Sequence, residues 1–551
     1  MSDQIDPYLA RATAPGSPFE IGERGGMRQF VNAPGDLNLL IESARAHGEK
    51  TFVVEGERRI SYADMFEWRD RLVPLLDIAR GDRVAICMRN RPEWMAAFLA
   101  IVRAGGVAAL LNSRGAPEEL VSMIDEVDPV LVLADNERAA LIREGGYTGR
   151  LIDLTEPQDG QANGTGNTGT ALPELGIAHP DDPVAILFSS GTTGRVKGAV
   201  LSHRNLITGL ASVQLSGTMI LMRTAEQYGM EIEQLVAQIP QQAVLLVYPL
   251  FHISGLGSAF LAPLLSGTKV VIMRRWDAHD ALRLIEAERI TMFTAVPTML
   301  WDVLNKAKVE NADLSSLTNV ASGGQALPVN LLEAMRASCP QAAMGTGYGM
   351  TECSGAVAQS VGEDFLRKPA SAGRVLPLVE MRILGDEGEE LPRGQTGTIS
   401  VRGAMIMKGY WNRPDETAAA LSPDGWLDTG DVGYIDEEGY VFIVDRKKDM
   451  VISGGENIYC AEVERVMGEM PGVMECAAFG VPDDRLGEKL VAVAVATGIG
   501  EDDIRQTVAA RLASYKAPAR VAITQQTLPR NHVGKADKIA LRQQWPTLIG
   551  E

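Results

Sequence analysis

Ten residues near the middle of the chain have the types and spacing of a phosphate-binding loop. They run from Ser189 to Gly198 in the order Ser-Ser-Gly-Thr-Thr-Gly-Arg-Val-Lys-Gly, after an apolar stretch, 184–188, that predicts a buried strand. Glycines let backbone N–H groups turn toward phosphate oxygens, hydroxyl groups donate further hydrogen bonds, and Lys197 supplies positive charge. The order differs from a Walker P-loop, because Lys197 follows Gly194 by three residues and precedes Gly198. Taken alone, the stretch also fits a flexible surface loop.

The length and charge of the chain limit the classes of protein to which it can belong. At 551 residues it is too long for one ordinary hydrophobic core, so about two to four domains or subdomains are expected. Its net charge of −19 argues against nucleic acid as a partner, because phosphate backbones bind basic faces. The five cysteines are far apart, with no CxxC pair or Cys/His cluster to suggest zinc. Free thiols in a reducing cytoplasm are the simplest interpretation, and residues 1–23 contain no apolar signal core.

One apolar stretch requires a test for a membrane span. Residues 244–266 contain no Asp, Glu, Lys or Arg and are long enough to cross a bilayer. However, Pro249, His252, Pro263 and two glycines interrupt them, and residues 244–248 are typical of a strand. The pattern therefore predicts a buried strand, turn and helix rather than a transmembrane span.

Apolar runs typical of strands alternate with helical patterns in two parts of the chain. The first part predicts strands at 82–88, 107–111 and 130–134, with helices at 92–104 and 117–126. The second predicts strands at 269–273 and 291–294, with helices at 279–289 and 298–306. Near-continuous apolar strands separated by helices indicate a parallel sheet that is covered on both faces, so the predicted fold class is α/β.

Changes in composition mark three boundaries. The low-complexity segment 159–170 is predicted to be a mobile connection. After residue 373, short runs between glycine turns predict a β-rich subdomain with strands at 379–384, 398–402, 433–435 and 440–444. Five consecutive charged residues, 445–449, then separate this part from about 100 C-terminal residues. Those residues have their own predicted helices (461–470, 502–515) and strands (477–481, 491–495), enough for a separate small domain.

Seven further motifs follow the loop in the order found in one known superfamily. They are Tyr248-Pro249-Leu250-Phe251-His252, Ser322-Gly323-Gly324, Thr346-Gly347-Tyr348-Gly349-Met350-Thr351-Glu352, Trp426-Leu427-Asp428-Thr429-Gly430-Asp431, Asp445-Arg446-Lys447-Lys448-Asp449, the segment from Gly454 to Glu464, and the segment from Leu528 to Lys535. With these motifs the chain resembles the adenylate-forming superfamily of acyl-CoA synthetases, luciferases and peptide-synthetase adenylation domains, from about residue 35 to about residue 545. The third and fourth motifs are the most diagnostic. Val196 and Cys460 stand where the family usually has proline.

The resemblance implies an α/β fold with a large N-terminal adenylation domain, residues 1–445, and a small mobile α+β domain, residues 450–551. The large domain is expected to hold stacked, mostly parallel sheets with helices to about residue 372, and the β-rich subdomain from 373 to 445. The implied activity is that of an ATP-dependent acid–CoA ligase. Such an enzyme converts an acid and ATP to an acyl-adenylate and pyrophosphate, and then forms acyl-CoA and AMP. The implied cofactors are ATP, Mg²⁺ and coenzyme A.

Family positions that hold the nucleotide correspond to residues of these motifs. The β- and γ-phosphates are expected at the loop residues Ser189, Ser190, Gly191, Thr192, Thr193, Gly194 and Lys197, of which Thr193 is also predicted to act in catalysis. Adenine is expected beside Ser322, Gly323, Gly324, Thr346, Gly347, Gly349 and Met350, with Tyr348 stacked on it. Thr351 and Glu352 are expected to contact phosphate and Mg²⁺, for which a carboxylate is a natural ligand. Asp431 is expected to accept hydrogen bonds from the ribose, and Arg446 to lie at the edge of the nucleotide.

The resemblance also assigns residues to catalysis, to the acid and to coenzyme A. The predicted catalytic residues are Lys535, Glu352 and Thr193, and Lys535 is the main one, which reaches from the small domain to the carboxylate and the α-phosphate during adenylation. His252, Gly323 and Gly349 are expected near the acid; Ser453, Gly454 and Gly455 at the pantetheine tunnel; and Lys516 at the phosphates of coenzyme A. One orientation of the small domain cannot serve both half-reactions, so relatives rotate it about a hinge, 446–449, and the position of their pivot is Lys448.

Each of the main candidates also has an ordinary structural interpretation. The alternatives are a packed core tyrosine for Tyr348, a carboxylate at a helix start for Glu352, a turn residue for Asp431, a solvated linker charge for Arg446, an exposed loop lysine for Lys535 and a structural histidine for His252. The full set of motifs favours the functional interpretation for these residues. For His252 the functional and the structural interpretation are equally supported.

The sequence leaves the acid, the acceptor and the oligomeric state open. The predicted walls of the acid pocket, 248–257, 295–299, 322–325 and 344–350, have no obvious cation for a second carboxylate, which favours a hydrophobic monoacid, whether fatty, aromatic or alicyclic. Residues 219–242 are a candidate extension or lid of that pocket. The alternative functions are loading of a separate carrier protein, luciferase-like chemistry, and non-catalytic nucleotide binding, which would be expected to lack Lys535, Glu352 or Asp431. A homodimer is the prior expectation.

Overall fold

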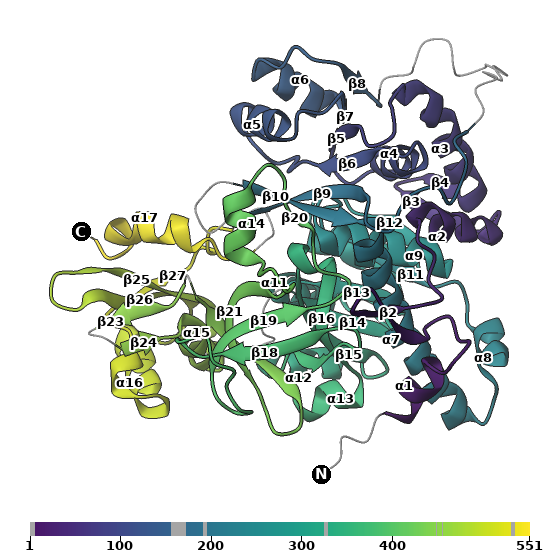
Figure 1. The fold of residues 1–551 in the computed structure, drawn as a ribbon. Helices are drawn as coiled ribbons and strands as arrows, with labels where there is room; N and C mark the ends of the chain where they lie inside the picture. Colours follow the sequence, from purple (N-terminus) through teal and green to yellow (C-terminus); the bar gives the residue numbers. More distant parts are fainter. Residues whose placement is uncertain are drawn as a thin grey trace.

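The computed structural model describes residues 6–155, 172–190, 196–323, 329–447, 449–453, 456–530 and 535–550. The connection predicted at 159–170 lies outside these ranges. In Figure 1 most of the purple and blue part of the chain lies above the teal and green strands of a large sheet, the first purple helix lies below them near the N-terminus, and the yellow C-terminal part lies at one side. Three sheets build this arrangement, together with one short hairpin.

A seven-stranded sheet ends in the two strands that flank the predicted phosphate loop. Its order is β20-β10-β9-β6-β5-β7-β8, in which β9 to β8 run parallel and β10 and β20 are antiparallel. The bounds are β5 (Arg83–Cys87), β6 (Val107–Leu110), β7 (Leu131–Ala134), β8 (Leu151–Asp153), β9 (Pro183–Ser190), β10 (Val196–Ser202) and β20 (Gly409–Tyr410). Because side chains alternate along a strand, Val84 and Ile86 face the core between the sheets, whereas Ala85 and Cys87 face the outer helices.

The larger sheet has thirteen strands and is mixed. The strands β15-β14-β13-β11-β12-β3 are parallel, and an antiparallel β4 closes that end. Beyond β15 the sheet continues through antiparallel neighbours as β16-β17-β22-β21-β19-β18. The bounds are β3 (Thr51–Glu55), β4 (Arg58–Ser61), β11 (Ala243–Leu246), β12 (Lys269–Ile272), β13 (Met292–Ala295), β14 (Asn319–Gly323), β15 (Ala343–Met350), β16 (Gly355–Val361), β17 (Gly373–Val375), β18 (Glu380–Leu384), β19 (Gly397–Arg402), β21 (Leu427–Ile435) and β22 (Tyr440–Arg446). The strands predicted as a β-rich subdomain therefore extend the parallel sheet.

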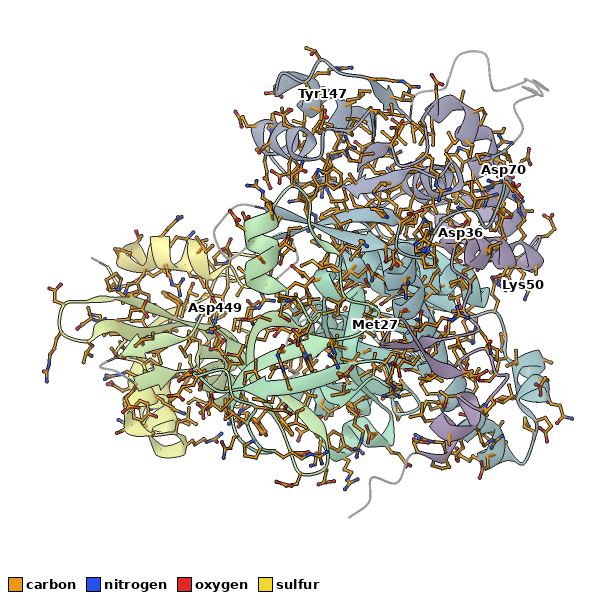
Figure 2. All side chains as sticks on the ribbon, viewed as in Figure 1. Met27, Asp36, Lys50, Asp70, Tyr147 and Asp449 are labelled. Carbon is orange, nitrogen blue, oxygen red and sulfur yellow. The ribbon has the colours of Figure 1, made fainter. Side chains whose placement is uncertain are left out.

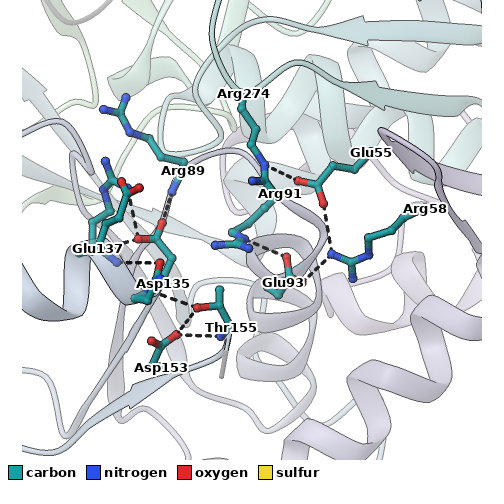
Figure 3. A network of polar contacts seen from close by, with 12 residues as sticks. Glu55, Arg58, Arg89, Arg91, Glu93, Asp135, Glu137, Asp153, Thr155 and Arg274 are labelled. Carbon is teal, nitrogen blue, oxygen red and sulfur yellow. Dashed lines mark hydrogen bonds and ion pairs between the residues drawn. The ribbon is translucent and has the colours of Figure 1, made fainter. Parts of the chain in front are cut away.

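Helices fill the space between these two sheets. All twelve residues of α4 (Pro92–Arg103) are buried, as expected for a helix that is apolar on every side. The same core includes side chains of α2 (Leu37–Ser43), α3 (Tyr62–Leu76), α7 (His203–Tyr228), a π-helix (Ser254–Leu261) and α9 (Ala262–Ser266). Polar contacts also join the layers, since Arg58 of β4 donates to Glu55 at 3.1 Å and to Glu93 of α4 at 2.9 Å (Figure 3).

Other helices cover the outer faces of the two sheets. α5 (Pro117–Val127) and α6 (Asn136–Glu144) pack on the seven-stranded sheet, and α10 (Ala278–Ala287), α11 (Pro297–Glu310) and α12 (Val329–Ser338) pack on the larger one. The predicted α/β class is confirmed, and the predicted strands and helices agree with the observed ones to within a few residues at their ends.

The apolar stretch 244–266 forms the predicted strand, turn and helix. It contains β11, the π-helix and α9, and its larger apolar side chains lie in the core. Among the described residues, α7 is the one helix whose length and composition would suffice to cross a membrane. Of the apolar window in α7, 44% is buried inside the protein.

The C-terminal part has its own sheet of five strands. The order is β24-β23-β26-β25, and β27 runs parallel to β26. The bounds are β23 (Val451–Ser453), β24 (Glu456–Ile458), β25 (Val473–Asp483), β26 (Gly487–Ala496) and β27 (Val521–Thr524). One face packs on α15 (Cys460–Gly468) and α16 (Glu501–Arg511), and the other on α17 (Lys538–Leu548). Figure 2 labels Asp449 where this part meets the large sheet.

The helix predicted at 502–515 is shorter than expected. α16 ends at Arg511, because Leu512 is extended and a separate turn of 3-10 helix, η4 (Ser514–Lys516), follows. The last buried side chain of α16 is Val508. The remaining elements are α1 (Pro7–Ala12), β1 (Ile21–Arg24), β2 (Met27–Phe30), η1 (Ala44–His47), α8 (Ile232–Gln238), η3 (Thr351–Cys353), α13 (Glu363–Arg367) and α14 (Pro414–Ala420). All five cysteines have free thiols, and four are buried.

Candidate active site

Two predicted motifs end at the same edge of the large sheet. β14 finishes with Ser322 and Gly323 and β15 with Gly349 and Met350, and the strands are parallel neighbours. In open α/β sheets, ligands bind outside the carboxyl ends of such strands. A β-bulge follows Tyr348, and a side chain at Gly349 would overlap the carbonyl oxygen of Gly355. Glycine is therefore required at 349 by the close approach of β16.

Asp431 on β21 is the centre of a polar cluster at this edge. Its carboxylate accepts a hydrogen bond from the Tyr348 hydroxyl at 2.7 Å and lies 3.4 Å from Nε of Arg446, its register partner on β22. Burial raises the pKa of Asp431, and the charges of Arg446 and Lys535 and the Tyr348 hydrogen bond oppose that rise. The Asp431 side chain is only 8% exposed, whereas that of Arg446 is 47% exposed. A carboxylate with free lone pairs, held in this way, can accept two hydroxyl groups.

The Trp426–Asp431 motif supplies the turn that fixes Asp431. Gly430 has a φ of +70°, which favours glycine, and its N–H donates to the Asp428 carboxylate at 2.8 Å. The Thr429 hydroxyl donates to the carbonyl of Ile399 at 2.8 Å and accepts from the N–H of Asp431 at 3.1 Å. Asp428, Thr429 and Gly430 therefore each have a local structural reason in this turn.

Glu352 and Lys197 meet through a third residue, Tyr410. Glu352 lies in η3 directly after β15 and is 5% exposed. The Tyr410 hydroxyl donates to Glu352 Oε1 at 3.0 Å, and Nζ of Lys197 lies 5.2 Å from the centroid of the Tyr410 ring. Sequence reasoning missed Tyr410, because a tyrosine soon after the apolar run 404–407 is equally typical of a core residue.

The carboxylate of Glu352 fits a magnesium ion that arrives with ATP. Among the described residues, no group of three or more His, Cys, Asp or Glu side chains could hold a metal ion by itself. Mg²⁺ is usually held by one or two carboxylates together with substrate phosphates and water, rather than by a complete protein cage. A single buried carboxylate at the end of β15 is therefore a suitable donor set.

Lys535 approaches this site from the C-terminal part of the chain. It lies in a loop closed by hydrogen bonding from Asp537 N to the carbonyl of Pro529 at 2.8 Å and by a bridge between Arg530 and Ala536. The positive charge of Lys535 lowers the pKa of Asp431. The orientation of the small domain therefore directs Lys535 toward the same polar cluster.

The segment expected near the acid is held by Asn90, which follows β5. The Asn90 side chain donates to the carbonyl of Tyr248 at 2.8 Å and accepts from the N–H of Leu250 at 2.9 Å. The Tyr248 hydroxyl is buried, has no hydrogen-bond partner among the described residues, and lies 3.3 Å from where a Cβ on Gly323 would be. His252 begins the turn before the π-helix, and its ring lies 4.5 Å from that of Phe251.

The two described residues expected near coenzyme A lie in the small domain. Ser453 ends β23 and pairs in register with Gly487 of β26. Lys516 forms an ion pair with Glu462 at 2.6 Å, so its ammonium already has an acidic partner in this orientation.

A small recess beyond the carboxyl ends of strands from both sheets has a basic lining. Arg89, Arg114 and Arg274 contribute to its wall, together with the buried Ser113 and the partly buried Trp276. Burial and the neighbouring charges of Arg138 and Arg114 lower the pKa of Arg89. Positive charges that crowd in this way favour an anionic ligand.

Several predicted residues lie outside the described part of the chain. They are Gly191, Thr192, Thr193, Gly194, Gly324, Lys448, Gly454 and Gly455. Ser189 and Ser190 are placed by their backbone at the end of β9, where they pair with Lys197 and Val196 of β10.

Comparisons with known proteins agree with this architecture. The family model of AMP-binding enzymes matches residues 40–411, and that of the AMP-binding enzyme C-terminal domain matches residues 462–535. A solved structure of O-succinylbenzoate coenzyme A synthetase from Bacillus subtilis, in complex with ATP and magnesium ion, has a TM-score of 0.74 and 29% identity. The match covers 92% of this chain and 98% of that one.

Two curated relatives are similar over almost their whole length. One is 3-[(3aS,4S,7aS)-7a-methyl-1,5-dioxo-octahydro-1H-inden-4-yl]propanoyl:CoA ligase of Rhodococcus jostii, 34% identical over 92% of this chain and 98% of the relative. The other is a feruloyl-CoA synthase of an Amycolatopsis species, 35% identical over 92% and 98%.

Proposed function

The chain belongs to the family of AMP-binding enzymes, and we propose that it is an ATP-dependent acid–CoA ligase. In the first half-reaction, a carboxylate oxygen attacks the α-phosphorus of ATP and pyrophosphate leaves. In the second, the thiol of coenzyme A attacks the acyl carbon and AMP leaves. The observation that carries the proposal is the convergence of Glu352, Asp431 and Lys535, from three distant motifs, around one edge of the large sheet.

The adenylation step joins two anions, so positioning and neutralisation of charge dominate its barrier. Asp431 would hold the ribose, and Lys197 would hold the phosphates that depart as pyrophosphate. Glu352 would hold Mg²⁺, which when bound shields the charge of the phosphates. Lys535 would donate to the oxygens that carry the developing charge at the α-phosphate. Its approach to Asp431 supports this assignment.

The basic recess supports coenzyme A as the acceptor. Coenzyme A carries several phosphate groups, and Arg89 and Arg114 of the recess offer a matching charge, whereas Arg274 pairs with Glu55 at 2.7 Å. Arg89 and Arg114 follow strands of the seven-stranded sheet, on the large domain. Lys516, paired with Glu462, is a weaker candidate for the same phosphates.

We propose a hydrophobic monoacid with a ring, alicyclic or aromatic, as the substrate. One relative is named for a bicyclic dione acid and the other for an aromatic acid. Both names describe the joining of that acid to coenzyme A. The buried hydroxyl of Tyr248, without a partner and next to Gly323, would suit a substrate that carries an oxygen. A fatty acid is the second candidate, since a long-chain-fatty-acid–CoA ligase of Mycobacterium tuberculosis is 32% identical.

Pyrophosphate release tests the proposed reaction. The protein is incubated with MgATP and a panel of acids in matched pairs, each ring acid with and without an oxygen substituent, beside fatty acids of several lengths. Acid-dependent pyrophosphate release, followed by formation of acyl-CoA and AMP once coenzyme A is added, is the expected result. Transfer to a carrier protein but not to coenzyme A would support the carrier-loading alternative. Binding of ATP without release of pyrophosphate for any acid would support a non-catalytic nucleotide-binding protein.

A further inference from the structure

The short strand β20 brings Tyr410 between two parts of the site that are far apart in sequence. Tyr410 and Gly409 pair in register with Ala199 and Val200 of β10. Hydrogen bonding from Trp411 N to the carbonyl of Gly198 at 2.7 Å continues the pairing. This pairing places the Tyr410 ring beside the strand that carries Lys197.

Both ends of the Tyr410 side chain contact a charged group. The hydroxyl donates to Oε1 of Glu352 at 3.0 Å, and the ring lies 5.2 Å from the ammonium of Lys197. A phenol keeps its proton at neutral pH, so the Tyr410 hydroxyl is the donor and the Glu352 carboxylate the acceptor. The geometry is that of a charge-assisted hydrogen bond at one end and a cation–π contact on the face.

The backbone around Tyr410 leaves it little freedom to move. Its N–H donates to the Thr417 hydroxyl of α14 at 2.9 Å. Gly409 has a φ of +142° and lies against Thr417, so a larger residue there would be strained. On the other side, Met407 N donates to the carbonyl of Glu352 at 2.8 Å. Strand β20 and the turn that carries Glu352 are therefore held as one unit.

We propose that Tyr410 is a positioning residue of the adenylation site, which holds the Glu352 carboxylate through its hydroxyl and the Lys197 ammonium through its ring face, so that both act on one metal-bound triphosphate. This proposal rests on the proposed function and adds a residue to it. A carboxylate has about four lone-pair sites, and the hydrogen bond from Tyr410 uses one of them, at Oε1 of Glu352. The ring face takes the ammonium without using any of its three N–H donors, which stay available for phosphate oxygens.

Two substitutions separate the two contacts. Tyr410→Phe removes only the hydroxyl, and Tyr410→Leu removes the ring as well. Isothermal titration calorimetry measures the affinity for ATP in the presence of Mg²⁺ and in the presence of EDTA. Comparison of the two affinities tests each contact without any catalytic turnover. For Tyr410→Phe we expect the gain in ATP affinity caused by Mg²⁺ to fall roughly tenfold, as for a lost hydrogen bond to a charged group. The affinity for metal-free ATP should stay within about twofold. For Tyr410→Leu, metal-free ATP should bind roughly threefold or more weakly as well.

Tyr440, on β22 of the larger sheet, offers a matched control. Its hydroxyl donates to the carboxylate of Asp364, and its buried ring has Lys368 and Arg374 at 4.8 Å and 4.2 Å. Tyr440→Phe therefore removes the same kind of bond away from the site, and ATP binding should keep its Mg²⁺ dependence. Equal weakening of metal-free and metal-bound ATP by Tyr410→Phe would identify Tyr410 as a structural residue and overturn the proposal.

The same titrations separate this proposal from the proposed function. If the unaltered protein binds MgATP but releases no pyrophosphate with any acid, the ligase function fails, while the positioning role is still read from the binding data. If the unaltered protein is an active ligase and Tyr410→Phe binds MgATP as tightly as it does, the positioning role fails alone. Should Tyr410→Leu not fold, Tyr410→Phe decides the question.

Discussion

At the scale of single residues, two lysines divide the work at one site. Lys197 lies on β10 beside the predicted phosphate loop, and Lys535 lies in the loop before α17. Lys535 lowers the pKa of Asp431, whereas Lys197 lies over Tyr410. We infer that Lys197 holds the departing pyrophosphate and that Lys535 stabilises the charge that develops during adenylation.

Replacement of Lys535 by alanine tests this division. A donor placed where charge develops contributes about 2.7–4 kcal/mol to a transition state, so Lys535→Ala should slow adenylation at least about a hundredfold. Thioester formation from supplied acyl-adenylate should largely survive. Both half-reactions are measured separately, by pyrophosphate release and by acyl-CoA formation. Lys489→Ala, which removes a lysine paired with Asp483 at 3.5 Å, is the control. Equal losses in the two half-reactions would contradict the assignment.

Sequence patterns locate the residues of this site that belong to contiguous motifs, even where their contacts are distant in sequence, as for Asp431 and Tyr348. Asp431, Glu352 and Lys535 all come from such motifs, and the turn around Gly430 explains why that motif has those residue types. Tyr410 could not be found in this way. Its partners lie more than fifty residues away on β10 and in η3, and only the pairing of β20 with β10 brings them together.

At the scale of elements, the end of β22 and the start of α15 share a buried carboxylate. Asp445 accepts from the N–H of Arg446 at 2.7 Å and from the N–H of Ala461, in the first turn of α15, at 3.2 Å. Burial raises the pKa of Asp445 to about 6, although the charge of Lys538 on α17 opposes that rise. Lys538 itself pairs with Glu464 of α15 at 2.8 Å. Three elements thus meet around one group that titrates near neutral pH.

Replacement of Asp445 by asparagine should therefore change stability in a pH-dependent way. Because the folded pKa of about 6 exceeds the ordinary value of 3.8, the Asp445 carboxyl group favours the folded state below about pH 4, and this contribution is lost as pH rises through 6. The stability of Asp445→Asn relative to the unaltered protein should then rise by about 1.4 kcal/mol per pH unit between these two values, and level off near pH 7. Native-state hydrogen exchange of α15 amides measures it, since unfolding of a multidomain chain is not two-state.

Asp483 provides a control with the opposite sign. Its pKa is lowered by hydrogen bonds from the N–H groups of Leu486 and Arg485. The stabilising contribution of the Asp483 carboxylate is present at neutral pH and is lost as pH falls. Asp483→Asn should therefore be less stable than the unaltered protein at neutral pH, rather than more stable. A pH-independent difference for Asp445→Asn would contradict the burial argument.

Single elements were predictable because hydrophobic period and turn residues are local. The parallel strands and their helices were expected close to where they lie, as for α4 and β6. The order of strands was not readable. For example, β17 pairs with β16 and β22 and so joins the β-rich strands to the parallel ones. This pairing depends on contacts between segments that are distant in sequence.

At the scale of the whole molecule, one orientation of the small domain is seen. In this orientation Lys535 lies toward Asp431. Ser453 belongs to the five-stranded sheet of the same small domain, and it is the described member of the predicted pantetheine-facing stretch. We propose that the small domain places only one of them at the site at a time and rotates between the half-reactions. The large domain supplies Asp431, Glu352 and Tyr410, which need no movement between half-reactions.

Contacts on both sides of position 448 concentrate the expected rotation there. Lys447 N donates to the carbonyl of Gly430 at 2.9 Å, which ties it to the large domain. Asp449 and Met450 donate to the carbonyl of Arg446 at 2.9 Å and 3.1 Å, and the carbonyl of Asp449 accepts from the thiol of Cys460 at 3.1 Å. Lys448 itself lies outside the described residues. A change of orientation would break the bonds to Arg446 while Lys447 stays anchored.

Lys448→Pro tests whether this position is the pivot. Proline fixes φ near −65° and so removes the freedom that a rotation needs. If the adenylation orientation is the one retained, pyrophosphate release should persist, while acyl-CoA formation from supplied acyl-adenylate collapses. Lys448→Ala removes the same side chain but leaves φ free, so both half-reactions should stay near those of the unaltered protein. Normal rates for Lys448→Pro in both half-reactions would place the pivot elsewhere. Loss of both by Lys448→Ala as well would instead assign the effect to the lysine side chain.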